Sequence, residues 1–427
     1  MRESLTLLVV LAIGASPLHG QRLKDRILDL FSFGDCGAPL CLDGSVNVAN
    51  GHGNHFLPDV IAGNAAMIGF LTDAIGTSSS SIPLGASSSG QTFKFVNGLP
   101  VKTSNSAGPI FGERAQTLGR GRLLIGTNLT SINFKTIRGT PLDQLVLNLA
   151  HEDRPPTGLG NPLLENDILE IRIALAMNLL VSTFHITYGL TDGLDLGIAV
   201  PLVHTSLEGR STGQIFPFGS TAVHFFTGTE ANPGLRASAA TFGSATGIGD
   251  IAVRLKGKLV STDRFGLSVM GDARLPTGNE DDLLGAGHLS VRGNAIASAQ
   301  FGPFSPHLNL GYLVWTGPHR TDAVLAAVGF DHLMSSWATM AVDVLSEWQV
   351  SESDLRLPGP IHYVSPFART VIPTNIANRR DHRVIGTMGF KFQTRGGPMI
   401  ITSGLVPLKA GGLQPYGAWN LGLEFNF

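Results

Sequence analysis

The hydrophobic pattern near residue 427 predicts a β-strand with two chemically different faces. From Trp419 onward every second residue is apolar, while the residues between them are small or polar and include Glu424. Successive side chains of a strand point to opposite faces, so this period of two indicates one apolar and one polar face. Such a strand needs lipid on one side and water on the other. The aromatic Phe427 on the apolar side is typical of the last strand of a bacterial outer-membrane barrel.

The same alternation recurs through most of the chain and predicts twelve strands. The stretch 167–190 is apolar enough to suggest a transmembrane helix, but the strict alternation around Glu170 and Arg172 favours one long strand. The predicted strands cover residues 121–135, 167–190, 194–202, 250–259, 267–275, 287–301, 305–316, 322–332, 336–349 and 384–393, a stretch after Gly397, and residues 413–427.

These strands together predict a closed sheet. Unpaired backbone groups are costly in lipid, so a sheet crosses a membrane only if it leaves no edge. An even strand number is expected for a single-chain bacterial barrel. We therefore predict an all-β fold, a transmembrane antiparallel up-and-down β-barrel of about 12 strands, formed by residues 108–427 in the bacterial outer membrane. The long connections at 209–247 and 350–381 are predicted to be extracellular loops.

The residues before the barrel fall into two predicted parts. Residues 1–20 hold a charge, a short apolar core and a small-residue exit, which is typical of a secretory signal peptide. Residues 21–107 form an N-terminal segment with candidate helices at 23–31 and 59–75. The pattern leaves open whether this segment plugs the barrel or extends into the periplasm.

Aromatic residues provide a separate indication of a membrane protein, because such residues gather at both interfaces of a barrel. One predicted girdle lies at the end with short turns and the other at the end with long loops. The members at the turn end are Tyr188, Phe265, Phe301, Phe304, Trp337, Phe425 and Phe427, and those at the loop end are Phe134, Trp315, Trp348 and Tyr416.

The polar faces of the predicted strands carry charges of both signs, which we expect to line the lumen. Because positive and negative charges nearly balance, we expect these residues to form internal salt bridges that fill a narrow barrel. The alternative is that some of these residues line a permeation path. The predicted lumen residues are Glu170, Arg172, Asp195, Asp250, Arg254, Lys256, Lys258, Asp272, Arg274, Arg292, Asp343, Lys391 and Glu424.

Composition excludes several other functions. A net charge of −2 argues against a nucleic-acid binder, which normally carries an excess of Lys and Arg. Cys36 and Cys41 are the two cysteines, and an oxidising periplasm favours a disulfide between them over a metal site, which would need more ligands. His185 and His307 lack a suitably spaced nucleophile, so we predict neither an enzyme nor a cofactor.

Five stretches resemble the outer-membrane proteins grouped under the MetA pathway of phenol degradation. They are Gly108–Arg122, Tyr188–Gly197, Val200–Pro201, Gly247–Asp250 and Arg274–Gly287. The resemblance implies an outer-membrane channel or transporter that passes small hydrophobic or aromatic compounds by passive diffusion.

An alternative function and a set of partners remain open from the sequence. The alternative is a structural or adhesive barrel that acts through the loops at 209–247 and 350–381. The expected partners are a small solute, outer-membrane lipid with lipopolysaccharide, and the barrel assembly machinery, which would recognise Phe427.

Overall fold

The computed structural model of the chain describes most of residues 106–427 and a few earlier segments. The described residues are 22–31, 33, 74–75, 93–96, 99–102, 106–150, 167–218, 225–229, 231–317, 321–352, 357, 359–364, 367–394 and 397–427. The predicted signal peptide, the candidate helix at 59–75 apart from its last two residues, and the Cys36–Cys41 disulfide lie outside them. Among the described residues, no helix is long and apolar enough to cross a membrane.

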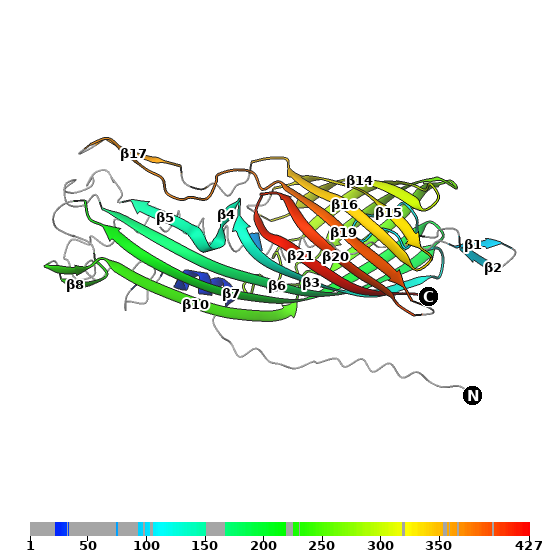
Figure 1. The fold of residues 1–427 in the computed structure, drawn as a ribbon, viewed down its shortest axis with the longest axis horizontal. Coiled ribbons are helices and arrows are strands. Elements are labelled where there is room, and N and C mark those ends of the chain that lie inside the picture. The colour runs from blue at the N-terminus through cyan, green and yellow to red at the C-terminus, as the bar shows by residue number, and fades with distance from the viewer. Residues whose placement is uncertain are drawn as a thin grey trace, which may run out of the picture.

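Twelve antiparallel strands close into a barrel, which confirms the predicted fold class (Figure 1). Each strand pairs with its neighbour along the chain, and the last strand, β21, pairs with the first, β3, to close the ring. In spatial order the strands are β3 (Leu123–Ile137), β6 (Ile168–Thr191), β7 (Leu194–Phe216), β11 (Ala252–Ser261), β12 (Phe265–Arg274), β13 (Ser290–Ala299), β14 (Phe304–Trp315), β15 (Ala323–Ser335), β16 (Ala338–Gln349), β19 (Arg383–Gln393), β20 (Met399–Lys409) and β21 (Leu413–Asn426).

The remaining elements lie at the two ends of the barrel. The end where short turns join neighbouring strands is the periplasmic end of such barrels, and the β1–β2 hairpin lies beyond it (Figure 1). The additional elements are α1 (Leu23–Asp29), β1 (Phe93–Val96), β2 (Leu99–Lys102), β4 (Thr140–Pro141), a 3-10 helix (Leu142–Gln144), β5 (Leu145–Ala150), β8 (Thr227–Thr229), β9 (Asn232–Gly234), β10 (Arg236–Ile248), β17 (Ile361–Tyr363) and β18 (Arg369–Val371).

Strands β6 and β7 continue far past the barrel and form a projecting sheet. Beyond the ring, β5 pairs with residues 168–173 of β6, and β10 pairs with residues 202–214 of β7. We call this four-stranded sheet the extension; it projects from the loop end of the barrel (Figure 1). The prediction that residues 209–247 form a loop is therefore wrong, because most of these residues belong to β7 and β10. The predicted loop at 350–381 contains the small β17–β18 hairpin.

The outward face of β6 changes from polar to apolar at one height. On the barrel part, outward side chains such as Phe184 and Ile186 are 56% and 51% exposed, whereas on the extension the outward residues include Glu170 and Arg172. Strand β7 changes at the matching level, between Leu202 and His204. Lipid therefore surrounds the barrel part, and water surrounds the extension.

This change of face corrects two predicted lumen residues. Glu170 and Arg172 lie on the outer face of the extension, where Arg172 Nε donates to Glu170 Oε1 at 2.7 Å. The inner face there is apolar, with Leu169 and Ile171 fully buried. Alternation predicts two faces correctly, but above the membrane the outer face meets water and the inner face meets a protein core.

Helix α1 covers the inner, apolar face of the extension (Figure 1). Its buried residues Leu23 and Ile27 belong to one hydrophobic cluster together with the inner side chains of β6 and β7. Ser211 Oγ of β7 donates a hydrogen bond of 2.6 Å to the Leu30 carbonyl. This part of the N-terminal segment thus lies inside the extension rather than in the periplasm.

The aromatic girdles are mostly as predicted. All seven members at the turn end are exposed, and so are Trp348 and Tyr416 at the loop end. Phe134 and Trp315 are exceptions, because their side chains point inward and are only 3% and 9% exposed. Their positions on the strands have the parity of the lumen face, so the prediction that they face lipid is wrong.

Candidate functional site

The barrel lumen holds most of the predicted charged residues, and most of their side chains are buried. The structure places on the inner wall Asp195, Arg254, Lys256, Asp272, Arg274, Arg292, Asp343, Lys391 and Glu424. Alternation along each strand puts these side chains on the face opposite the exposed apolar residues. The lumen is therefore a desolvated polar environment in which each charge needs a partner.

Asp250 and Lys258 have more local roles than lining the lumen. Asp250 lies in the break between β10 and β11, where its carboxylate accepts hydrogen bonds from the Gly278 and Ala286 amides at 3.1 and 2.7 Å. It thereby holds the β12–β13 connection against that break. Lys258 Nζ donates to the Asp192 carbonyl at 2.6 Å, at the periplasmic turn between β6 and β7.

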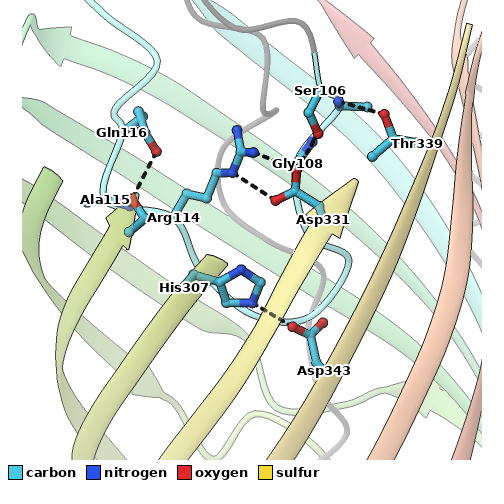
Figure 2. A network of polar contacts seen from close by, with 11 residues as sticks. Ser106, Gly108, Arg114, Ala115, Gln116, His307, Asp331, Thr339 and Asp343 are labelled. Atoms are coloured by element: carbon cyan, nitrogen blue, oxygen red, sulfur yellow. Dashed lines mark hydrogen bonds and ion pairs between the residues drawn. The ribbon is translucent and has the colours of Figure 1, made fainter. Parts of the chain in front are cut away.

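Residues 106–120, which we call the strap, run inside the barrel just before β3. The strap contacts the inner wall from β16 round to β7, and Figure 2 shows its course beside β14 and β15. Apart from its first two residues, the strap lies on the barrel side of the predicted boundary between residues 107 and 108, but it forms no part of the wall. The strap is held by three groups of contacts.

The first group centres on Asp331 of β15 (Figure 2). Arg114 Nε donates to Asp331 Oδ1 at 2.9 Å, and Ser106 Oγ donates to the same carboxylate. The Arg114 and Asp331 side chains are 4% and 0% exposed. The Ala107 amide also donates to Thr339 Oγ1 at 3.0 Å. A buried pair of this kind fixes the strap because separating its two charges inside the barrel costs several kcal/mol.

The second group centres on Glu113 of the strap. Lys256 Nζ approaches Glu113 Oε2 at 2.9 Å, and both side chains are almost fully buried. Asn309 fixes the backbone of Glu113 with two hydrogen bonds. Its side-chain oxygen accepts from the Glu113 amide at 2.8 Å, and its side-chain nitrogen donates to the Glu113 carbonyl at 2.9 Å. Glu113 thus supplies the negative charge that Lys256 requires.

The third group lies where the strap meets β7. The Leu118 amide donates to Asp195 Oδ2 at 2.9 Å, and Thr117 Oγ1 donates to the Asp192 carbonyl at 2.9 Å. Gly189 permits this approach, because a Cβ there would lie 1.9 Å from the Gly119 carbonyl oxygen. The strap is therefore fixed at both ends.

Asp331, Glu113 and Asn309 are absent from the residues predicted from the sequence. The sequence holds one signal that points to Glu113. This residue is next to the oppositely charged Arg114, within the stretch Gly108–Arg122 that carries part of the family resemblance. Their partners lie 143 to 217 residues away, so spacing could not identify them.

A row of charges crosses three neighbouring strands of the wall. Asp272 of β12 is the cross-strand partner of Arg254 on β11 and of Arg292 on β13. Arg254 Nε donates to Asp272 Oδ2 at 2.7 Å, while Arg274 and Arg292 lie 3.7 and 3.9 Å from Asp272 Oδ1. Elsewhere Lys391 pairs with Glu424 at 3.6 Å. Salt bridges within the barrel thus account for much of the lumen charge.

The two candidate histidines both face the lumen. His307 Nε2 lies 2.6 Å from Asp343 Oδ1, beside Gly112 of the strap. His185 packs against Gly126 on the inner face of β6. In the part of the chain that the structure describes, no group of three His, Cys, Asp or Glu side chains could hold a metal ion.

A cavity of about 160 Å³ remains in the lumen beside the strap. Apolar side chains such as Phe111, Met270 and Ile296 form part of its wall. The polar part of the lining contains three arginines and three carboxylates, so the charges balance. These are Arg254, Arg292, Arg383, Glu113, Asp272 and Glu347. The site therefore combines apolar walls with a neutral set of ion pairs.

Solved outer-membrane proteins show low sequence identity to this chain. An outer membrane channel from Pseudomonas putida F1 has 13% identity and a TM-score of 0.43, covering 73% of this chain and 98% of its own. A Pseudomonas aeruginosa FadL homologue has 12% identity and a TM-score of 0.31, with coverages of 72% and 89%. A TodX monoaromatic hydrocarbon channel mutant has 10% identity and a TM-score of 0.35, with coverages of 74% and 92%.

Sequence comparison gives a more specific result. No curated protein matches the chain. Residues 169–327, from β6 into β15, match the model of the family described as "Putative MetA-pathway of phenol degradation". This match confirms the family resemblance over the strands that carry Asp195, Arg254, Asp272 and Arg292.

Proposed function

We propose that the protein is an outer-membrane channel that passes small hydrophobic compounds by passive diffusion. The observation that carries this proposal is the lumen cavity of about 160 Å³. A purely structural barrel of twelve strands could fill its interior with side chains. Here a space the size of a small molecule remains at the level of the membrane.

The chemistry of the interior favours apolar solutes. On the extension, the inner residues of β6 from Leu169 to Val181 form one continuous apolar row. This row packs against α1 in one hydrophobic cluster, so a solute that enters from this end passes through or beside that apolar core before it meets the ion pairs of the barrel. Transfer of apolar surface from water to such surroundings is favourable by about 25 cal/mol per Å². The family match to phenol degradation is consistent with such solutes.

The strap is the natural gate of this path. It occupies the lumen between the cavity and the periplasmic turns, where Phe111 and Glu113 line the cavity itself. A solute that leaves the cavity toward the periplasm therefore has to displace the strap or pass beside it. Movement of residues 106–120 becomes the step that limits flux.

A reversible crosslink tests both the channel and the gate. A Cβ added at Gly266 of β12 would lie 3.0 Å from Ala115 Cβ of the strap, so the pair Gly266→Cys and Ala115→Cys is close enough for a disulfide after a small adjustment. We expect uptake of radiolabelled toluene into vesicles with a lipopolysaccharide outer leaflet to fall several-fold on oxidation and to recover with reductant.

The control for this experiment is the unsubstituted protein taken through the same oxidation and reduction. Its uptake should stay constant and exceed that of vesicles without protein. Uptake equal to that of empty vesicles would contradict the channel. Uptake that the crosslink leaves unchanged would contradict the gate alone.

The partners other than the solute follow from the surface. The exposed apolar band of the barrel contacts outer-membrane lipid. Contact with lipopolysaccharide at the loop end and recognition of Phe427 by the barrel assembly machinery stay predictions. Phe427 is 69% exposed and lies 6.4 Å, centroid to centroid, from the Phe425 ring.

A further inference from the structure

A surplus of positive charge lies on the outside of the barrel at its loop end, where β16, β19 and β20 meet. The segment Arg379–Arg383 contains three arginines and one carboxylate, and Lys409 is the last residue of the neighbouring strand β20. Among the described residues, no carboxylate forms an ion pair with Arg379, Arg380 or Lys409. All three are exposed. This surface therefore presents positive charge to whatever surrounds it.

The carboxylates close to this surface are already engaged by other groups. Asp381 accepts from Arg138 Nε at 2.8 Å and from the Gly412 amide at 2.9 Å. Glu347 pairs with Arg383 at 2.7 Å on the lumen side of the wall. Neither carboxylate is available to the exposed cations, so their charge has to be balanced from outside the protein.

The surplus lies at the border between lipid and water. Lys409 Nζ lies 4.7 Å from the centre of the Trp348 ring, a cation–π contact that holds the ammonium at the outer surface. Trp348 belongs to the loop-end girdle, and tryptophan side chains mark the headgroup level of a membrane. On β20, the exposed apolar residues Val406 and Leu408 lie just before Lys409. The ammonium therefore lies at the headgroup level of the outer leaflet.

His382 adds a hydrogen-bond donor to the same surface. Its ring lies 5.0 Å from that of Trp348, centroid to centroid, and its Nδ1 accepts a hydrogen bond of 3.1 Å from the Gln349 amide. Burial and the nearby charges of Lys409 and Arg380 lower the pKa of His382, which keeps the ring neutral at pH 7. A neutral imidazole that accepts at Nδ1 carries its proton on Nε2 and donates from there.

A phosphate group fits this surface. It carries a charge between about −1.5 and −2 at pH 7 and three acceptor oxygens, and lysine and arginine are its usual partners in proteins. The oxygens match three donors, namely the Lys409 ammonium, the Arg380 guanidinium and His382 Nε2. At the headgroup level of the outer leaflet, phosphate groups belong to lipid A, the membrane anchor of lipopolysaccharide.

We propose that Arg380, His382 and Lys409 form a binding site for a phosphate group of lipid A on the outer wall of the barrel. Trp348 positions the lysine, and the acyl chains of the lipid lie against the apolar surface of β20. The inference goes beyond the proposed function, because the site lies outside the lumen and does not depend on conduction. It gives the expected contact with lipopolysaccharide a defined place on the molecule.

Titration of the full-length barrel in detergent tests the site, with bound lipid measured by native mass spectrometry. The probes are lipid A with both phosphates, the same lipid with both phosphates removed, and inorganic phosphate as a competitor. EDTA is present throughout, so that no divalent cation bridges a phosphate to a carboxylate. We expect the phosphorylated lipid to bind at least tenfold tighter than the dephosphorylated one, and equimolar inorganic phosphate not to displace it.

Substitutions locate the site. Lys409→Gln and Arg380→Gln should each weaken binding of phosphorylated lipid A about fivefold, and the double variant about 25-fold, because each basic residue near an anionic membrane surface contributes about that factor. Affinity for the dephosphorylated lipid should stay unchanged. Arg264→Gln is the matched control, since Arg264 is an exposed cation at the periplasmic turn between β11 and β12. The shift between unheated and boiled samples in gels shows that each variant is folded.

The outcomes distinguish a defined site from general attraction. Equal affinity for the two forms of lipid A would overturn the site, and so would a loss in Arg264→Gln as large as that in the double variant. Displacement of the lipid by equimolar inorganic phosphate would show a site for the free anion and overturn the assignment to lipid A.

Discussion

Replacement of Asp331 by Ala is expected to release the strap and to increase conductance through the barrel. The Asp331 carboxylate is fully buried and holds both Arg114 and Ser106. Without it, the Arg114 guanidinium loses its buried carboxylate partner, which costs about 3–5 kcal/mol if the guanidinium stays inside the barrel. Movement of the strap toward water relieves that cost. Single-channel recordings in planar bilayers should show larger and longer openings than the unsubstituted protein.

Glu424→Ala is the matched control for this variant. Glu424 and Lys391 form another buried ion pair of the inner wall, with both side chains 1% exposed, and it lies between β19 and β21 rather than on the strap. The substitution should lower the stability of the barrel to urea by a similar amount without changing its conductance. If both variants conduct alike, general loosening of the barrel and not release of the strap explains the openings.

Replacement of Ile186 by Arg is expected to destabilise the barrel by about 2–4 kcal/mol, because it places a charge on the lipid face near the middle of the membrane. Ile186 is 51% exposed, and its neighbours in the ladder, Ile125 and Ile198, are outward apolar residues as well. Urea unfolding in lipid vesicles measures the loss, and the shift between unheated and boiled samples in gels reports folding.

The control for Ile186→Arg lies on the same face of the same strand. Ala176 is also exposed and outward but belongs to the extension, where its partner on β7 is Glu208. Ala176→Arg should leave stability unchanged or raise it slightly. A similar loss in both variants would show that lipid reaches the extension, which contradicts the boundary drawn between Leu202 and His204.

The barrel wall could be predicted from the sequence because its physical cause is local. Lipid outside and polar partners inside impose a period of two, and β14 at Phe304–Trp315 agrees with the predicted 305–316. The same rule fails for Glu170 and Arg172, because alternation separates two faces without telling which one meets water. That depends on the height of each residue relative to the lipid, which only the folded barrel defines.

Neither the strap nor the extension could be predicted from the sequence, and the reasons differ. The strap has no regular pattern, and Glu113 acquires its role only when the barrel brings Lys256 to within 2.9 Å. Strand β10 is composed largely of Ala, Ser, Gly and Thr, because α1 packs closely against it. Those residues are typical of loops, so residues 236–248 do not suggest a strand.

The length of β6 determines how far the protein reaches beyond the lipid-facing surface. Its 24 residues extend for about 80 Å along the strand at roughly 3.3 Å per residue, and the twelve residues from Ile168 to Leu179 precede the change to a lipid-facing surface. The sugar chains of the outer leaflet form a hydrated layer that slows oily molecules. In the proposed channel, the mouth of the extension stands beyond the lipid-facing surface, so a solute meets the protein within that sugar layer before it reaches the bilayer.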